Sequence, residues 1–425
     1  MRILLVSYYF PPFNSVGAMR PGALAGFLAQ QGHDVHVLTC SNQPFPQGLP
    51  QHLPAAQVTA VPGWSVNAPI EWLRGGRDKV ARQGFGATAS AATPMGRLGR
   101  LYKTLLHWPD GQLGWVQAAT AAGRALLRSK PFDLVYASAP PFSGLRVAAS
   151  LSRESGVPWV AELRDLWTDN HAYAYPAWRR TIERRWERRL LSSARALVTV
   201  SAPLVRQLGR FGLPVWEVRN GCDPADFDGL ARPEGFGEDR ARLDLVFTGN
   251  VYDGHYDLDA FCAGLSAYLA QGGRARVHVA GRNIAGLQHA ALRHGVAQHF
   301  TFRPTVPRRQ ALAMQGHSDV LLAFLWSGGG EEGVYSAKLF EYAAAGRPIL
   351  AVGRRNDVGA LIEAARIGSV HPDAASVAAA LALLQARKLA TGVLSVAPAP
   401  GHDFSRRSQF LLLEQRLAAL MAGRS

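Results

Sequence analysis

Lys338 and Glu341 are two charged residues of opposite sign, three positions apart in the segment 335–350 (YSAKLFEYAAAGRPIL). Residues at this spacing share one face of a helix. A lysine can neutralise a phosphate, and a neighbouring carboxylate can accept hydrogen bonds from two sugar hydroxyls, so the pair could bind a sugar nucleotide. The same two residues could instead form a surface ion pair on an ordinary helix, which contributes little to stability.

The residues around this pair predict the helix that would carry it. Ser336 is a favourable N-cap, Gly346 suits the C-terminal stop, and Pro348 cannot continue the helix. The apolar runs 319–325 and 349–352 on either side have the length of strands. A helix that follows a parallel strand begins at the carboxyl edge of the sheet. Its free N–H groups and its dipole favour phosphates there.

Short apolar strands alternate with helical segments and turn residues along the chain. Near-continuous apolar strands are typical of sheets covered on both faces. We therefore predict an α/β protein with two doubly wound, Rossmann-like domains that face each other across a cleft. The expected strands are 3–7, 35–38, 58–61, 134–137, 159–162, 197–200 and 216–218 in the first half, and 243–247, 277–280, 301–302, 320–324 and 349–352 in the second.

The formal net charge of +15 and the pI near 10.3 call for an acidic partner. Nucleic acid is not favoured, because no zinc-finger spacing, RNA-recognition signature or basic–aromatic alternation occurs. An anionic membrane surface fits better, since segment 71–103 has seven basic and two acidic residues, with Trp72 and Leu73 adjacent. The alternative is a poorly ordered insert, because residues 83–99 are rich in Gly, Ala, Ser and Thr.

A second basic segment, 179–191 (RRTIERRWERRLL), resembles a nucleic-acid-binding arm at first sight. Ile182, Trp186 and Leu190 recur in it every four residues, with glutamates interleaved. We interpret the segment as an amphipathic helix that turns these three residues inward and exposes a basic face.

The location of the chain is predicted from its apolar segments and its cysteines. No run approaches the roughly 18 apolar residues of a membrane span, and the N-terminal MRILLVSYYFPP is typical of a first strand rather than a signal peptide. The cysteines Cys40, Cys222 and Cys262 lack metal-like spacing. We expect a cytoplasmic protein, peripheral on the inner face of the cell membrane.

The run 336–348 (SAKLFEYAAAGRP) resembles the nucleotide-sugar motif of the retaining glycosyltransferases of family 4, in the branch that builds bacterial surface polysaccharides. In that family the glutamate at the position of Glu341 binds the ribose hydroxyls of the donor. A second glutamate usually lies eight residues earlier, near the donor sugar. This chain has Gly333 there, and the resemblance leaves Glu332 as the candidate for that catalytic role. The donor-binding residues that the motif implies are Ser336, Lys338, Leu339 and Glu341.

Two motifs of the first half resemble the same family. The opening strand leads into residues 8–20 (YYFPPFNSVGAMR), whose Gly17 could let backbone approach the donor pyrophosphate or the acceptor, with Arg20 neutralising charge. The segment 160–167 (VAELRDLW) resembles the R-D-x-W element of the polysaccharide branch. Asp165 could orient the acceptor hydroxyl or accept its proton, and Arg164 is its catalytic neighbour. The alternative for Arg164 is a structural bridge to Asp165 or Glu162.

In the second half, Gly249 and Asn250 match the family's G-N element, which faces the donor. Many members place an arginine and a lysine just after this strand, and this chain does not. Arg282, at the end of another expected strand, could bind the diphosphate with its guanidinium fork. Asp257-Leu-Asp259 has the spacing of a metal-binding D-x-D motif, but we expect Asp257 to cap a helix that begins near Leu258.

The resemblance covers nearly the whole chain and implies the GT-B fold. It implies an acceptor-binding domain at 1–227 and a nucleotide-sugar-binding domain at 241–403. Residues 228–240 would form the linker, and the C-terminal helix in 404–425 would cross back to the first domain. It also implies transfer with retention from a nucleotide sugar, UDP favoured, to a lipid-linked or polysaccharide acceptor, as in lipopolysaccharide or exopolysaccharide biosynthesis.

The resemblance further implies that no metal or cofactor is needed, because the helix dipole, Lys338 and Arg282 would stabilise the leaving diphosphate. Two alternatives use the same fold. One is a nucleotide-sugar-binding subunit that has lost turnover, motivated by Gly333 and the missing Arg/Lys pair. The other is a sugar-nucleotide epimerase.

Overall fold

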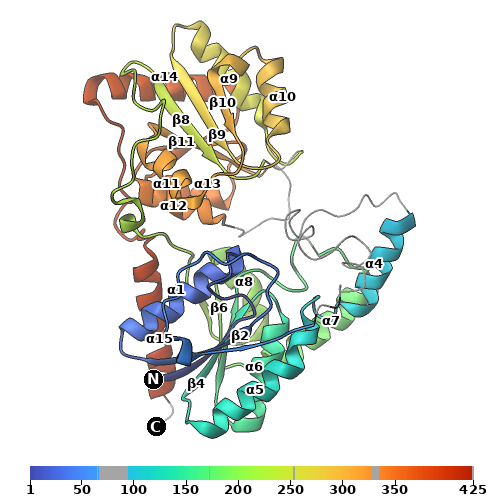
Figure 1. Cartoon of the computed structure of the whole chain (residues 1–425). Coiled ribbons are helices and arrows are strands. Elements are labelled where there is room, and N and C mark those ends of the chain that lie inside the picture. The colour runs from blue at the N-terminus through green and yellow to red at the C-terminus, as the bar shows by residue number, and fades with distance from the viewer. Residues whose placement is uncertain (65, 67–93, 172, 252–253, 327–334, 424–425) are drawn as a thin grey trace. The chain divides into compact units, whose positions relative to one another are not determined.

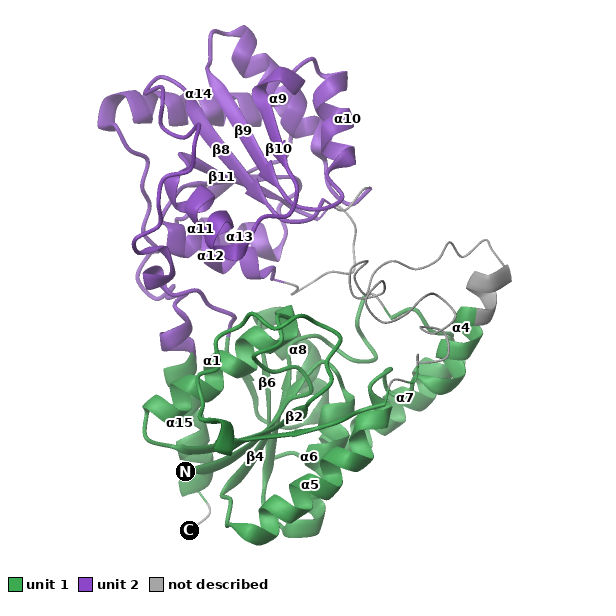
Figure 2. Ribbon diagram, in the orientation of Figure 1, with its two compact units in different colours: residues 1–218, 410–425 green, residues 219–409 purple. Residues whose placement is uncertain are grey.

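The computed structural model describes residues 1–64, 66, 94–171, 173–251, 254–326 and 335–423 (Figure 1). The chain divides into two units (Figure 2). Unit 1 comprises residues 1–218 and 410–425, and unit 2 comprises residues 219–409. Each unit contains one parallel β-sheet with helices packed on both faces. The prediction of two doubly wound α/β domains is therefore confirmed.

The sheet of unit 1 has seven strands in the order β3-β2-β1-β4-β5-β6-β7. Alternate residues of β1 belong to opposite cores, as strand geometry requires. Leu4 and Val6 pack with helices α5 and α6, whereas Ile3 and Leu5 pack with α1 and α15. The strands are β1 (Arg2–Val6), β2 (Asp34–Cys40), β3 (Val58–Val61), β4 (Leu134–Ala139), β5 (Trp159–Leu163), β6 (Ala196–Thr199) and β7 (Val215–Glu217).

The sheet of unit 2 has six strands in the order β10-β9-β8-β11-β12-β13. Helices α9, α10 and α14 cover one face, and α11, α12 and α13 cover the other. The strands are β8 (Leu243–Thr248), β9 (Ala275–Ala280), β10 (Phe300–Arg303), β11 (Val320–Phe324), β12 (Ile349–Val352) and β13 (Gly368–His371). The sequence did not predict β13, because GSVH contains no apolar run and none of its residues is fully buried.

The helices follow the strands as crossover connections. In unit 1 they are α1 (Val16–Gln30), α4 (Pro94–Leu106), α5 (Val116–Ser129), α6 (Ser143–Ser155), α7 (Ala177–Leu191) and α8 (Ala202–Leu208). In unit 2 they are α9 (Leu258–Ala270), α10 (Ala285–Arg293), α11 (Arg308–His317), α12 (Ala337–Ala345), α13 (Asp357–Ala364) and α14 (Ala374–Thr391).

The last helix, α15 (Arg406–Ala422), begins in unit 2 and continues in unit 1. Its residues Phe410, Leu413 and Leu417 are buried in the same core as Ile3 and Phe27. The final helix therefore packs on the first domain, as the GT-B resemblance implied. Residues 228–240, the expected linker, contain no helix or strand and lie within unit 2.

The buried face of helix α7 differs from the one predicted. Its buried residues are Arg179, Glu183, Glu187 and Leu191, whereas Ile182 is 48% exposed. The prediction that Ile182 turns inward is wrong. Arg179 and Glu183 can be buried because they pair with each other at 2.7 Å.

Candidate functional site

The expected site in unit 2 lies at the carboxyl edge of its sheet. β8 and β11 are neighbours, although β9 and β10 follow β8 in the chain, so the connections leave this pair in opposite directions. Open α/β sheets bind ligands at such a reversal of strand order. Helix α12 follows β11. As predicted, Ser336 is its N-cap and accepts a hydrogen bond from the Lys338 N–H at 3.4 Å. Gly346 ends the helix in the left-handed conformation, also as predicted.

Lys338 extends from the first turn of α12 across the end of β8. Its Nζ lies 4.7 Å from the centre of the Phe247 ring. Gly249 makes room for it, because a Cβ at this position would lie 2.8 Å from Lys338 Cε. Gly249 also has a φ of 130°, which side chains disfavour. Burial lowers the pKa of Lys338 to about 8, although nearby Glu341 acts in the opposite direction.

Glu341 lies one turn further along α12 and is held by two side chains of α11. Gln315 donates a hydrogen bond from Nε2 to Glu341 Oε2 at 3.2 Å. Arg308 Nε lies 3.5 Å from Glu341 Oε1. A carboxylate can accept about four hydrogen bonds, so Glu341 retains the capacity to accept two from a ribose diol.

Gln315 is itself fixed by β8, because its Nε2 also donates to the Thr248 hydroxyl at 2.9 Å. Its Oε1 is buried and has no hydrogen-bond partner among the residues that the structure describes. The sequence did not predict Gln315 or Arg308 as site residues. Their only signal is a separation of seven residues, which places them on one face of α11.

The ends of β8 and β9 approach each other closely beside Lys338. A Cβ on Gly281 would lie 2.6 Å from the Gly249 carbonyl carbon. The N–H of Val251 donates to the carbonyl of Arg282 at 3.3 Å, which joins the loops that contain Asn250 and Arg282. The Arg282 side chain is exposed, and its Nε donates to the Thr305 hydroxyl at 3.4 Å.

The remaining unit 2 predictions concern Leu339 and Glu332. The Leu339 side chain is buried in the core, and its N–H donates to the Ser336 carbonyl at 3.0 Å. Its predicted donor contact would therefore have to come from backbone atoms. Glu332, the candidate second glutamate, lies outside the described residues.

In unit 1, Arg164 joins the loops at the carboxyl edge of the sheet. Its guanidinium donates to the carbonyls of Gly17 at 2.9 Å, Pro140 at 2.7 Å and Ala139 at 3.1 Å. Gly17 lies in the first turn of α1, which follows β1, and Ala139 and Pro140 lie at the end of β4; the order of this sheet reverses between these two strands. Arg164 thus fixes the backbone at Gly17, where a Cβ would come within 2.8 Å of the Tyr9 ring.

Asp165 follows Arg164 and is half-buried. Burial raises the pKa of its carboxyl group, although Arg164 and His171 oppose that rise. A raised pKa makes a carboxylate a better proton acceptor at neutral pH. The geometry is therefore compatible with the predicted role of Asp165 toward an acceptor hydroxyl.

Arg20 does not neutralise ligand charge as expected. Its side chain is only 7% exposed and pairs with the fully buried Glu162 at 2.9 Å. It also donates to the Val218 carbonyl at 2.9 Å. A guanidinium that balances a buried carboxylate cannot leave it without exposing that charge to a low-dielectric core, so Arg20 is structural.

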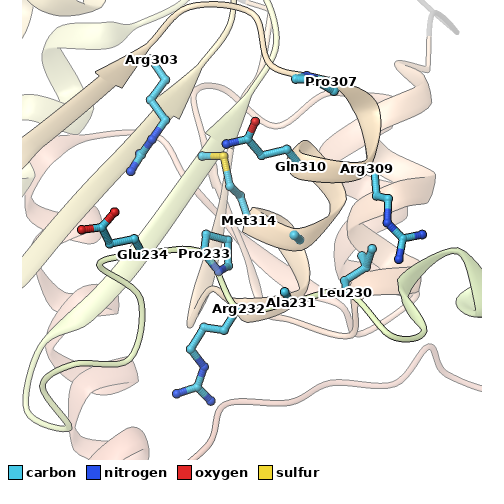
Figure 3. A pocket seen from close by; sticks show the side chains of 11 residues that line it. Leu230, Ala231, Arg232, Pro233, Glu234, Arg303, Pro307, Arg309, Gln310 and Met314 are labelled. Carbon is cyan, nitrogen blue, oxygen red and sulfur yellow. The ribbon is translucent and has the colours of Figure 1, made fainter.

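A pocket of about 510 Å³ lies against α11, on a different face of this helix from Arg308 and Gln315 (Figure 3). Arg232, Arg303 and Arg309 line it with Glu234, around a floor that includes Met314. Neither Lys338 nor Glu341 lines this pocket.

Asp257 caps α9, as predicted, since its carboxylate accepts from the Ala260 N–H at 2.9 Å. Asp259 instead pairs with Arg293 at 2.7 Å. No group of three or more metal-ligating side chains occurs in the part of the chain that the structure describes. No helix among the described residues is long and apolar enough to cross a membrane.

Comparison with protein families gives a match between residues 22–226 and the model described as Glycosyltransferase Family 4. No curated protein matches the chain. The family match covers most of unit 1, where Gly17 lies just before its start and Arg164 and Asp165 lie inside it.

Solved structures resemble the whole chain. A sucrose-phosphate synthase from Thermosynechococcus elongatus is 14% identical, with a TM-score of 0.59 and full coverage of both chains. A glycosyltransferase from Rickettsia africae ESF-5 is 10% identical, with a TM-score of 0.56 and coverage of 100% and 99%. The lipopolysaccharide outer core galactosyltransferase WaaB in its apo form is 12% identical, with a TM-score of 0.51 and coverage of 99% and 97%. The chain has the GT-B fold of these proteins.

Proposed function

We propose that this protein is a glycosyltransferase that moves a sugar from a nucleotide-sugar donor to an acceptor. The observation that carries the proposal is the arrangement at the start of α12, where Lys338 crosses Gly249 and Glu341 stands one turn away. A cation for phosphate and a carboxylate for a diol lie together where α/β sheets bind nucleotides. The family match and the shared GT-B fold support the same activity.

In this proposal unit 2 binds the donor. Lys338 and the N–H groups at the start of α12 neutralise the diphosphate, and Arg282 adds a second cation from the loop after β9. Glu341 accepts hydrogen bonds from the ribose hydroxyls. UDP is the favoured nucleotide by the resemblance of the α12 motif.

The reaction breaks the bond between the anomeric carbon and the diphosphate oxygen, and that oxygen keeps the electron pair. The acceptor oxygen forms the new bond to the anomeric carbon on the same face, which retains the configuration. The acceptor proton passes to a donor phosphate oxygen or to Asp165, whose raised pKa suits a proton acceptor. Preorganised charge around the leaving diphosphate supplies the main stabilisation of the transition state.

Replacing Glu341 tests the donor site. Wild-type protein should show a melting-point rise of a few degrees with one of UDP, GDP or ADP in excess. Glu341→Ala should bind that nucleotide at least about tenfold more weakly, which corresponds to about 1.4 kcal/mol. The matched control is Glu363→Ala, because Glu363 forms an exposed ion pair with Arg355. Unchanged nucleotide affinity in folded Glu341→Ala, measured by calorimetry, would remove the basis of the proposal.

We further propose that the acceptor is lipid-linked or a polysaccharide and that the protein works at an anionic membrane surface. Five large apolar side chains, each 45–55% exposed, lie on α4 and α7 of unit 1. The last turn of α4 contacts the first turn of α7, because Arg179 donates to the Thr104 carbonyl at 2.8 Å. The five side chains are Leu101, Leu105, Leu106, Trp178 and Ile182.

Basic side chains accompany this apolar patch. Arg185 and Arg189 continue the exposed stripe of Trp178 and Ile182 along α7 at helical spacing. Apolar side chains beside arginines suit the boundary of an anionic bilayer, where each basic residue adds roughly 1 kcal/mol. The predicted basic segment 71–103 coincides with this region only over 94–103, since 71–93 lie outside the described residues.

A vesicle experiment tests the membrane proposal. Wild-type protein should co-sediment with vesicles containing phosphatidylglycerol and release at high salt, because the electrostatic part is screened. The double variant Leu105→Asp, Trp178→Asp should lose binding. Leu292→Asp is the control, since Leu292 is 66% exposed on α10 of unit 2. Equal binding of both variants would contradict this use of the patch.

A further inference from the structure

Arg308 occupies a central position in unit 2, because it contacts both Glu341 and a second carboxylate. Its Nε lies 3.5 Å from Glu341 Oε1, and its Nη2 donates to Asp226 Oδ2 at 3.0 Å. Nε carries one N–H and Nη2 carries two, one of them beside the Nε–H and the other pointing away from it, so one planar guanidinium group can contact two acids in a fixed geometry. A lysine would place its three donors on one rotatable nitrogen and would lack this fixed planar geometry.

Asp226 extends the chain of charges to the start of α15. It lies in the short helix η4 (Pro224–Phe227), and its Oδ2 is 3.8 Å from Arg406 Nη2. Arg406 Nη1 in turn lies 3.4 Å from Asp223 Oδ2. These contacts form a continuous series, Glu341–Arg308–Asp226–Arg406–Asp223, that lies entirely within unit 2.

The far end of the series lies where the chain passes between the units. The chain leaves unit 1 after residue 218 and returns to it at residue 410. Residues 219–228 follow the first of these crossings, and residues 403–409 precede the second. Hydrogen bonds tie these two segments together: the Arg219 N–H donates to Gln409 Oε1 at 2.9 Å, and the Cys222 N–H donates to the Phe404 carbonyl at 3.3 Å. Gly221 fits against the backbone of Arg406, since a Cβ there would lie 2.6 Å from its Cα.

The contact between Arg308 and Glu341 is the part of this series nearest the donor site, and only the Asp226–Arg406 contact is longer. At 3.5 Å it is longer than an ordinary charge-assisted hydrogen bond, and the Arg308 side chain is 40% exposed. A diol that binds Glu341 would compete for the same carboxylate oxygens. Occupation of the site therefore changes how Arg308 divides its donors between Glu341 and Asp226.

We propose that Arg308 is a positioning residue for Glu341, and that the series from Glu341 to Arg406 couples nucleotide binding to the two connecting segments 219–228 and 403–409. This inference rests on the proposed donor site. It assigns Arg308 no contact with reacting atoms. Arg308 orients the carboxylate that binds the ribose, and it transmits the state of that carboxylate to Asp226.

The experiment combines nucleotide affinity with hydrogen exchange of the full chain. The probe is whichever of UDP, GDP and ADP the wild type binds most tightly. In wild type, saturating nucleotide should slow amide exchange in α12 and also in both connecting segments. In Arg308→Met, affinity should fall about tenfold. At saturating nucleotide α12 should still be protected, but the two connecting segments should not respond.

Arg309→Met is the matched control, because Arg309 is the next residue of α11 and forms no ion pair with a described residue; its guanidinium donates to the Gly229 carbonyl at 3.4 Å. It should behave as wild type. Arg308→Lys keeps the charge but lacks the planar guanidinium that holds both acids in a fixed geometry, so it should restore part of the affinity and none of the response in the connecting segments. If Arg308→Met is poorly folded, Asp226→Asn provides the second test, with affinity within about twofold of wild type and the response of residues 403–409 lost.

Two results would overturn the inference while leaving the proposed function intact: Arg308→Met matching Arg309→Met in affinity, or connecting segments that still respond in Arg308→Met and Asp226→Asn. A wild-type protein that binds no nucleotide would instead remove the proposed function, and the inference with it.

Discussion

The Lys338 ammonium group is largely shielded from solvent. It forms no ion pair with a described residue. Its pKa of about 8 lies below the ordinary value of 10.5 because burial penalises the charged form. Between pH 8 and 10.5 the unfolded chain holds this proton and the folded chain does not. The free energy of unfolding without ligand should therefore rise with pH in this window, by at most about 1.4 kcal/mol per pH unit from this group.

Nucleotide binding should show the opposite trend, because a diphosphate needs the protonated amine. We predict that nucleotide affinity falls as pH rises through 8, and that Lys338→Met removes both this fall and the rise in unfolding free energy. Calorimetric titration and urea denaturation at pH 7, 8, 9 and 10 would check the two slopes. Equal slopes in wild type and Lys338→Met would show that another group titrates.

The candidate-site residues that the sequence predicted are those identified by their neighbours within one helix. Ser336, Lys338 and Gly346 were assigned from positions within one helix, and the structure gives the expected cap and stop. Arg308 and Gln315 were missed, because they contact Glu341 from another helix. Arg20 was misassigned, since its partner Glu162 lies on a distant strand and no local pattern reports that contact.

At the scale of elements, Arg179 on α7 holds the end of α4. Its guanidinium is buried, pairs with Glu183, and donates to the carbonyls of Lys103, Thr104 and His107. The last carbonyls of a helix have no partner within the helix, so a cation there satisfies both hydrogen bonding and the helix dipole. Aromatic rings enclose the guanidinium, with the centre of the Tyr175 ring 3.6 Å away.

Removing this cation should destabilise unit 1 strongly. Arg179→Met leaves the Glu183 carboxylate buried without its counter-ion, with only the hydrogen bond from the Tyr173 hydroxyl, and should lower the free energy of unfolding by about 3–5 kcal/mol. The double variant Arg179→Met, Glu183→Leu should recover part of that loss, because no buried charge remains. Arg185→Met, on the exposed face of α7, should change little. Urea denaturation compares the three variants, and an unchanged midpoint for Arg179→Met would contradict this role.

Helix α7 also shows why the buried face of an element was harder to predict than its position in the sequence. Twelve strands were predicted from apolar runs, and each lies in a strand of the structure or overlaps one. The predicted orientation of α7 was wrong at Ile182, because the pattern of Ile182, Trp186 and Leu190 assumes that charged residues face water. Paired charges that also bond carbonyls of another helix overturn that assumption, and only the tertiary contacts reveal them.

At the scale of the whole molecule, α15 makes the stability of unit 1 depend on the last residues of the chain. Leu413 is fully buried between α15 and the sheet, and truncating such a leucine costs about 2–5 kcal/mol. Nine of the ten tryptophans precede residue 219, so tryptophan fluorescence reports mainly on unit 1. Nucleotide-dependent stabilisation would report on unit 2.

Leu413→Ala should therefore lower the denaturation midpoint seen by fluorescence while nucleotide affinity, measured below that midpoint, stays within about twofold of wild type. Leu389→Ala is the control, because Leu389 is 60% exposed on α14 and its loss should move neither quantity. A joint loss of fluorescence midpoint and nucleotide affinity would mean that the two units fold as one cooperative structure through α15. An unchanged fluorescence midpoint would contradict the packing of α15 on the first domain, because a cavity in a shared core cannot be free of cost.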